Sequence, residues 1–203
     1  MPPRVLPISP GTATESGLGA LIGDLRAIAD AGAEGVLLRE RALTDAAFLE
    51  LAGVARTLFS GGWLGVHDRV HIALSVGADA VHLGFKSLHP LEARGLAPTD
   101  VAIGHSHHSS ELADEVMAAD YRFLGPVHPT PSKTGWLEPL GLTSLAGLPM
   151  AGKTWAVGGI GPAEVPAVLD RGVAGVAAIG SIFGQDDVAG GMSAMLQAAR
   201  EHG

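Results

Sequence analysis

The sequence predicts an α/β protein whose single domain, residues 1–203, is a (β/α)8 TIM barrel. Short apolar runs and helical stretches alternate eight times along the 203 residues, which matches such a barrel near the lower end of its size range. The apolar runs are continuous, which is typical of parallel strands buried on both faces. Polar or glycine-rich segments follow the runs at the same end. A doubly wound open sheet is the alternative, because periodicity alone does not close a barrel.

The expected strands are short apolar runs bounded by turn residues. The first of them contains Pro7, which has no N–H to donate to a neighbouring strand and so weakens the prediction there. The eight runs are residues 5–9, 35–38, 63–66, 80–83, 101–104, 121–124, 154–157 and 175–179.

Helices are expected between these strands. Gly32 suits the position just after a helix, and Thr44 and Ser109 can each accept a hydrogen bond from the free N–H groups of the helix that follows. Pro162 suits a first helical turn, where its missing N–H costs nothing. Residues 136–152 are expected to be a loop insertion. The expected helices are residues 18–31, 45–60, 70–76, 88–94, 110–119, a segment beginning at 162, and 188–200.

Composition excludes several classes of function. The net charge is −8 and the isoelectric point about 5.5, which argues against a nucleic-acid partner because that needs a basic face. The absence of cysteine excludes disulfides, thiolate chemistry and cysteine-based zinc sites. The first residues lack the apolar stretch of a signal peptide, and no apolar run reaches membrane-spanning length. We therefore expect a cytoplasmic protein with no membrane partner.

A proline-rich loop, residues 125–135, follows the sixth expected strand. It carries the hydroxyls of Thr130 and Ser132 and the ammonium of Lys133, between glycines that leave backbone N–H groups free. These groups suit a phosphate or diphosphate. An ordinary proline-rich surface turn is the alternative.

Two arginines follow the second expected strand. Alternate residues of a strand point the same way, so Arg39 and Arg41 can face one cavity while Glu40 points outward. Two guanidinium groups together with Lys133 are sufficient to hold a diphosphate. The alternative is a solvated ion-pair cluster.

Other strand ends add further candidates for binding a phosphorylated small molecule. The ends of strands seven and eight are rich in glycine, and this is where (β/α)8 barrels commonly hold a phosphate. The candidates at these and the fifth strand end are Ser106, His108, Gly159, Gly180 and Ser181.

Asp68 is the best metal candidate, because Mg²⁺ takes one or two carboxylates together with substrate phosphates and waters. Residues 84–87, at the neighbouring strand end, provide no second carboxylate. Asp68 could instead be the hydrogen-bond partner of Arg39, Arg69 or His67.

Nine histidines are present, and a side chain of this type is a natural proton shuttle near neutral pH. Five of them should lie near the cavity mouth: His67, His105, His107, His108 and His128. No third zinc ligand is identifiable beside residues 105–108. His82, inside a strand, is expected to be structural.

Several motifs in the same order and spacing resemble one superfamily, the thiamin-phosphate synthases and the similar TenI family of thiazole tautomerases. The resemblance covers residues 18–200. Its most specific segments are LRER at 38–41, HDRV at 67–70, ADAVHLG at 78–84, GHSHHS at 104–109, ADY at 119–121, GPVHPTPSK at 125–133 and AVGGI at 156–160.

The resemblance implies a reaction and a set of roles. In the synthases, a pyrimidine diphosphate loses its diphosphate to Mg²⁺ and cationic residues, and a thiazole phosphate captures the pyrimidine carbocation through its ring nitrogen. The matching residues are Arg39 and Arg41 for diphosphate, Asp68 for Mg²⁺, Ser106, Thr130, Ser132 and Lys133 for the phosphate groups, and Gly159, Gly180 and Ser181 for the thiazole phosphate.

Five positions depart from the synthase pattern. Leu37 and Phe85 stand where synthases have Gln, Arg41 where they have Lys, His67 where they have Asn, and Ser87 where they have the second metal-binding Asp. These departures weaken the expected metal and diphosphate site. They favour a TenI-like member, whose reaction is a proton transfer that needs no metal.

We therefore expect a TenI-like tautomerase that binds a thiazole phosphate and uses no cofactor. The usual TenI catalytic histidine position holds Pro126, so His128 or His67 would move the proton, with Lys133 and Arg39 completing the catalytic set. One alternative is a divergent thiamin-phosphate synthase that acts with Mg²⁺ on Asp68. Another is a non-catalytic thiazole-phosphate sensor or accessory protein. Many such barrels are dimers, so a homodimer is open to this chain.

Overall fold

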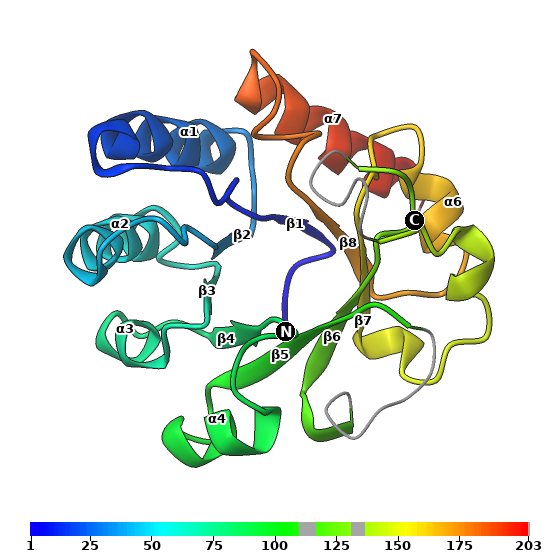
Figure 1. The fold of residues 1–203 in the computed structure, drawn as a ribbon. Helices are drawn as coiled ribbons and strands as arrows, with labels where there is room; N and C mark the ends of the chain where they lie inside the picture. The colour runs from blue at the N-terminus through cyan, green and yellow to red at the C-terminus, as the bar shows by residue number, and fades with distance from the viewer. Residues whose placement is uncertain (110–116, 131–136, 203) are drawn as a thin grey trace.

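The computed structural model describes residues 1–109, 117–130 and 137–202. Within these residues, eight parallel strands form one sheet in the order β1-β8-β7-β6-β5-β4-β3-β2 (Figure 1). The strands are β1 Val5–Pro7, β2 Gly35–Leu38, β3 Trp63–His67, β4 Ala80–Leu83, β5 Ala102–His107, β6 Tyr121–Leu124, β7 Thr154–Val157 and β8 Gly175–Ala178.

The sheet curls into a barrel because its two edge strands meet. A bridge joins Ile8, just after β1, to Leu37 in β2, and the N–H of Ser9 donates to the carbonyl of Leu37 at 3.0 Å. The predicted TIM barrel is thereby confirmed, and Pro7 does not prevent β1 from forming its parallel pairing with β8.

Helices surround the sheet (Figure 1). Those with described bounds are α1 Leu18–Asp30, α2 Asp45–Leu58, α3 Val70–Ser75, α4 Pro90–Leu96, α6 Val165–Leu169 and α7 Val188–Glu201. Short 3-10 segments are Glu15–Gly17, Leu142–Leu145 and Ala151–Lys153. The helix expected at residues 110–119 lies mostly outside the described residues.

Local chemistry explains where these helices begin and end. The Thr44 hydroxyl accepts from the N–H of Ala47 at 3.4 Å and so caps α2. At the end of α1, Gly32 has a φ of +94°, and two backbone hydrogen bonds close the helix: Gly32 N–H to Ala29 and Ala33 N–H to Ile28. Glycine reaches this left-handed conformation without strain.

Two helices begin later than predicted. The segment expected to become helical at Pro162 first makes a turn, in which the Gly161 N–H donates to the Glu164 carboxylate at 2.9 Å, and α6 begins only at Val165. The helix expected at 88–94 begins at Pro90, because His89 and Glu92 form a capping box there.

Apolar side chains form two layers, one outside the barrel wall and one inside it. The larger layer lies between the sheet and the helices. The smaller one lies inside the barrel, where Tyr121 meets Trp63 and Trp155 edge to face at ring-centroid distances of 6.2 and 5.8 Å. These three rings lie near the amino ends of their strands, so they close the bottom of the barrel and leave the carboxyl ends open. None of the helices described is long and apolar enough to cross a membrane.

Candidate active site

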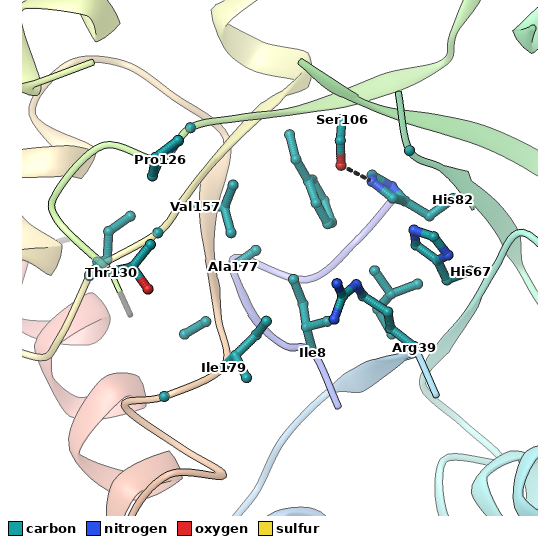
Figure 2. A pocket seen from close by; sticks show the side chains of 18 of the residues that line it. Ile8, Arg39, His67, His82, Ser106, Pro126, Thr130, Val157, Ala177 and Ile179 are labelled. Carbon is teal, nitrogen blue, oxygen red and sulfur yellow. Dashed lines mark hydrogen bonds between the residues drawn. The ribbon is translucent and has the colours of Figure 1, made fainter. Parts of the chain in front are cut away.

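A cavity of about 1140 Å³ opens at the carboxyl ends of the strands (Figure 2). Its floor is apolar and is made of Ile8, Leu37, Phe123, Val157 and Ala177. Polar side chains and glycine-rich strand ends form the rim. Such a floor can take a flat apolar ring while the rim orients charged substituents.

The cavity brings together most of the residues that the sequence singled out. Ser132 and Lys133 lie outside the described residues, so their predicted roles stay predictions. The predicted residues that line the cavity are Arg39, Arg41, His67, Asp68, Ser106, His108, Thr130, Gly159, Gly180 and Ser181.

His128 is not among the lining residues, although it was predicted to move a proton there. The chain at this point pairs with the end of β7: the N–H of Val127 donates to Val157 and that of His128 to Gly158, both at 3.0 Å. This pairing directs the His128 side chain against Gly159 instead of into the cavity, since a Cβ on Gly159 would lie 2.7 Å from the His128 Cβ. The geometry therefore argues against His128 as the proton shuttle.

Arg39 and Arg41 both line the cavity, as the alternation along β2 predicted. Burial and the positive charge of Arg41 lower the pKa of Arg39, while the charges of Glu40 and Asp68 oppose that shift. Arg39 is partly buried and Arg41 is exposed, and two neighbouring guanidinium groups favour a ligand that carries more than one negative charge.

Glu40 points away from the cavity, as predicted. It is buried, and its two carboxylate oxygens accept from the N–H groups of Gly11 and Ala13 at 2.9 and 2.8 Å. Its partner is therefore the loop between β1 and α1. That loop contributes Pro10 to the cavity wall.

Asp68 takes one of the alternatives foreseen for it, as a hydrogen-bond partner of His67. The His67 Nδ1 atom lies 2.9 Å from one Asp68 carboxylate oxygen, and the Ser87 hydroxyl donates to the other oxygen. Burial alone would raise the pKa of Asp68, but the hydrogen bonds from His67 and Ser87 and the charges of His67 and Arg41 outweigh burial and lower it. The carboxylate is therefore ionised and held in place.

His82 is a functional candidate that the sequence reasoning missed. It is fully buried in β4, and yet it lines the cavity. Its Nε2 atom lies 2.9 Å from the Ser106 hydroxyl (Figure 2), its Nδ1 atom lies 3.3 Å from the Tyr121 hydroxyl, and its ring stacks on Phe123. Alternation along β4 carried the signal, because Val81 and Leu83 belong to the outer apolar layer and His82 must then face inward.

The glycine-rich ends of β7 and β8 lie across the cavity from Arg39 (Figure 2). Gly159 has a φ of +65°, and a Cβ there would lie 2.5 Å from the Pro129 carbonyl oxygen, so a larger residue does not fit. A Cβ on Gly180 would meet no atom within 4 Å. This free space leaves room for a phosphate group, and the Ser181 hydroxyl nearby donates to the Ile160 carbonyl at 2.8 Å.

Comparison with known proteins identifies the family. A sequence model of the family described as thiamine monophosphate synthase matches residues 8–182. The chain belongs to this family. A putative thiamine-phosphate synthase from Geobacter sulfurreducens is 40% identical over 179 residues, which cover 83% of this chain and 78% of the relative. A thiamine-phosphate synthase from Desulfitobacterium hafniense is 35% identical over 173 residues, covering 80% and 82% of the two chains.

A solved structure agrees with the sequence relatives of this synthase-family chain. The thiamine phosphate pyrophosphorylase from Pyrococcus furiosus superposes with a TM-score of 0.83 at 27% identity, covering 98% of this chain and 96% of that one. The predicted superfamily and fold are thus confirmed. Because these relatives are named as synthases or pyrophosphorylases, the comparisons favour the synthase alternative over the tautomerase that we expected first.

The family implies Mg²⁺, so the residues around Asp68 must be tested against it. Mg²⁺ prefers oxygen ligands, and it is usually held by one or two carboxylates and by substrate phosphates. Among the described residues, no group of three or more His, Asp or Glu side chains could hold a metal ion. Among the described residues that line the cavity, Asp68 alone supplies a carboxylate, and both of its oxygens already accept from His67 and Ser87. These residues do not fit a metal ion held by the protein.

Proposed function

We propose that this protein is a transferase of the thiamine-phosphate synthase type, which joins a pyrimidine diphosphate to a thiazole phosphate and releases diphosphate. The observation that carries the proposal is one cavity with two separate places for anions, the arginine pair after β2 and the glycine-rich ends of β7 and β8, on either side of an apolar floor. We also propose that residues 1–203 act as a single domain.

The proposed reaction assigns a task to each group. The bond between the pyrimidine methylene carbon and the diphosphate oxygen breaks, and its electron pair leaves with the diphosphate. Arg39 and Arg41 stabilise the charge that develops there, as positioned donors do for a leaving group. The thiazole nitrogen then donates its lone pair to the carbon and forms the new C–N bond. Gly159, Gly180 and Ser181 hold the thiazole phosphate, and Thr130, Ser132 and Lys133 contribute from the loop after β6.

A second candidate is the tautomerase reaction, which moves a proton on a carboxylated thiazole phosphate. The observation that favours it is the His67–Asp68 pair. A carboxylate that accepts from one imidazole nitrogen fixes the ring and leaves its other nitrogen free for a proton. His67 would then act as the acid–base group in place of His128.

Turnover decides between the two. We expect the purified protein to form thiamin phosphate from hydroxymethylpyrimidine diphosphate and hydroxyethylthiazole phosphate in Mg²⁺-containing buffer. Arg41→Gln should lower kcat/KM by about 100-fold, because it removes a charge that stabilises the leaving group. Arg26→Gln, on the exposed face of α1, is the matched control and should leave turnover unchanged.

The opposite result is equally informative. A protein that thiazole phosphate stabilises against heat but that forms no thiamin phosphate would contradict the transferase proposal. Conversion of the carboxylated thiazole by the same protein, lost in His67→Gln, would establish the tautomerase instead. Stabilisation without either reaction would leave a thiazole-phosphate binding protein.

A further inference from the structure

The strand end that carries Asp68 is held rigidly by its own backbone. Asp68 has a φ of +64°, in the left-handed region that few non-glycine residues occupy. Its N–H donates to the His82 carbonyl at 3.0 Å, and its carbonyl accepts from the N–H of Val70 at 2.9 Å. The backbone position of Asp68 is therefore fixed, and the direction of its carboxylate is set by the two side chains that donate to it.

The first of those side chains is Ser87, whose hydroxyl already uses its single proton. It accepts from the N–H of Gly84 at 2.7 Å and donates its proton to Asp68. Ser87 follows β4, the strand beside β3, so its oxygen stands where a neighbouring strand end could offer a second metal ligand. A hydroxyl that donates a proton toward Asp68 occupies the place that a cation would need.

The second side chain is His67, whose buried ring presents Nδ1 to the other Asp68 oxygen. A carboxylate accepts hydrogen bonds only, so Nδ1 must carry the proton. The Nε2 atom lies on the side of Gly84, since a Cβ at Gly84 would be 3.4 Å from it. Asp68 thereby sets both the orientation and the tautomer of a ring that lines the cavity.

Charge points in the same direction as these contacts. The charge of Arg41 lowers the pKa of Asp68, and the charge of Asp68 raises the pKa of Arg39. The Asp68 carboxylate therefore already faces two positive side chains. A divalent cation placed at Asp68 would be repelled by both guanidinium groups with only one carboxylate to compensate.

We infer that Asp68 is a positioning residue for His67 in this chain and not a metal ligand, and that Arg39 and Arg41 hold the diphosphate group of the ligand without a metal ion bound to the protein. The inference rests on the proposed function for the identity of the ligand. Its structural basis is the arrangement in which His67 and Ser87 each donate to one oxygen of Asp68, which we call the closed arrangement.

Two binding measurements on the wild-type protein test the inference without any turnover. Inorganic pyrophosphate is the probe, and its affinity is measured by calorimetry with Mg²⁺ and with EDTA. We expect the dissociation constants in the two buffers to agree within about twofold, because the binding groups are guanidiniums. Mn²⁺ binding, followed by electron paramagnetic resonance, should be no stronger in wild type than in Asp68→Ala. Pyrophosphate binding that needs Mg²⁺, or Mn²⁺ binding abolished in Asp68→Ala, would overturn the inference.

A gain of metal binding gives the complementary test. Ser87→Asp replaces the donating hydroxyl with a second carboxylate beside Asp68, and it should bind Mn²⁺ at least about tenfold more tightly than wild type. Ser87→Ala is the matched control, because it opens the same contact without adding a ligand, and it should gain nothing. Equal Mn²⁺ affinity in wild type and a folded Ser87→Asp variant would contradict the closed arrangement.

The positioning role has its own spectroscopic signature. In ¹⁵N spectra of the imidazole groups, His67 should carry its proton on Nδ1 in wild type and in Ser87→Ala, and should shift toward the Nε2–H form in Asp68→Ala. An unchanged tautomer in Asp68→Ala would show that Asp68 does not direct the ring. These readings do not depend on catalysis, so absence of thiamin phosphate formation would refute the proposed function alone and leave the inference standing.

Discussion

At the scale of single residues, the buried carboxylate of Glu40 ties the loop before α1 to the end of β2. It accepts from the N–H groups of Gly11 and Ala13, and Arg39, next to it, lines the cavity. Glu40→Gln removes the charge and one of the two acceptor oxygens, so we expect a loss of about 1 to 3 kcal/mol in the free energy of unfolding. Urea denaturation measures this loss. Glu50→Gln, on the exposed face of α2, should cost almost nothing, and an equal loss in both variants would contradict the role of Glu40.

The buried imidazole of His82 makes stability depend on pH. Burial, followed by the charges of His67, His105 and Arg39, lowers the pKa of His82 well below its ordinary value of 6.5. As the pH falls below 6.5, the unfolded chain takes up a proton that the folded protein refuses, so stability falls by up to about 1.4 kcal/mol per pH unit. Above that pH the contribution is fully present.

Urea denaturation between pH 7 and pH 5 detects this dependence. The slope of stability against pH should become shallower by this amount in His82→Asn, even though that variant is less stable at pH 7. Identical slopes in wild type and His82→Asn would show that the imidazole of His82 is protonated in the folded state.

At the scale of the elements, β5 requires a glycine opposite the rings that fill the barrel. A Cβ on Gly104 would lie 2.2 Å from Tyr121 Cζ and 2.6 Å from His82 Nδ1. We therefore expect Gly104→Ala to destabilise the protein by about 1 to 3 kcal/mol or more, since the rings have no room to move. Gly53→Ala in α2, where a Cβ would meet nothing within 4 Å, should instead stabilise it by about 0.5 to 1 kcal/mol. Thermal unfolding gives both values, and similar signs would contradict the packing argument.

The elements also show how far the sequence alone could be taken. Four strands have the predicted bounds, those at residues 35–38, 80–83, 121–124 and 154–157, because buried parallel strands are short apolar runs that stop abruptly. The strand expected at 101–104 runs on to His107, since polar residues at a barrel mouth can continue a strand that apolar patterning ends too early.

The site was predictable where it depends on strand ends, and unpredictable where it depends on side-chain direction. Arg39 and Asp68 follow their strands directly and Gly159 lies two residues after β7, and the barrel gathers such positions at one mouth. His128 was misplaced because the pairing of its loop with β7 is a tertiary contact with no local signal. His82 was missed because a histidine inside a strand was taken for structure, although it contacts both the core and the cavity.

At the scale of the whole molecule, the barrel closes through few interactions. Neighbouring strands elsewhere share three or four paired positions, whereas β1 and β2 are joined by the Ile8–Leu37 bridge. The fully buried Ser9 strengthens this junction, because its hydroxyl accepts from the Arg39 N–H at 2.7 Å. The backbone that carries Arg39 is thus fixed by the closure of the barrel.

Removing that hydroxyl should loosen the junction. We expect Ser9→Ala to cost about 1 to 2 kcal/mol, since the partly buried N–H of Arg39 loses its acceptor. Hydrogen exchange should quicken at the amides of β1 and β2 and stay unchanged in β5 and β6. Ser75→Ala, at an exposed position in α3, should alter neither stability nor exchange. Uniform acceleration across all strands would mean that the junction is no weaker than the rest of the sheet.

The pairing of β1 with β8 has a consequence for biosynthesis. Residues 5–7 are translated long before residues 175–178, and yet these two segments are neighbours in the sheet. Until the ribosome has released β8, the partial barrel has no partner for β1 on that side. Nascent chains truncated before β8 should therefore leave the barrel open between β1 and β7 and bind pyrophosphate weakly. The competent pocket forms in one late step, once the last strand has joined the first.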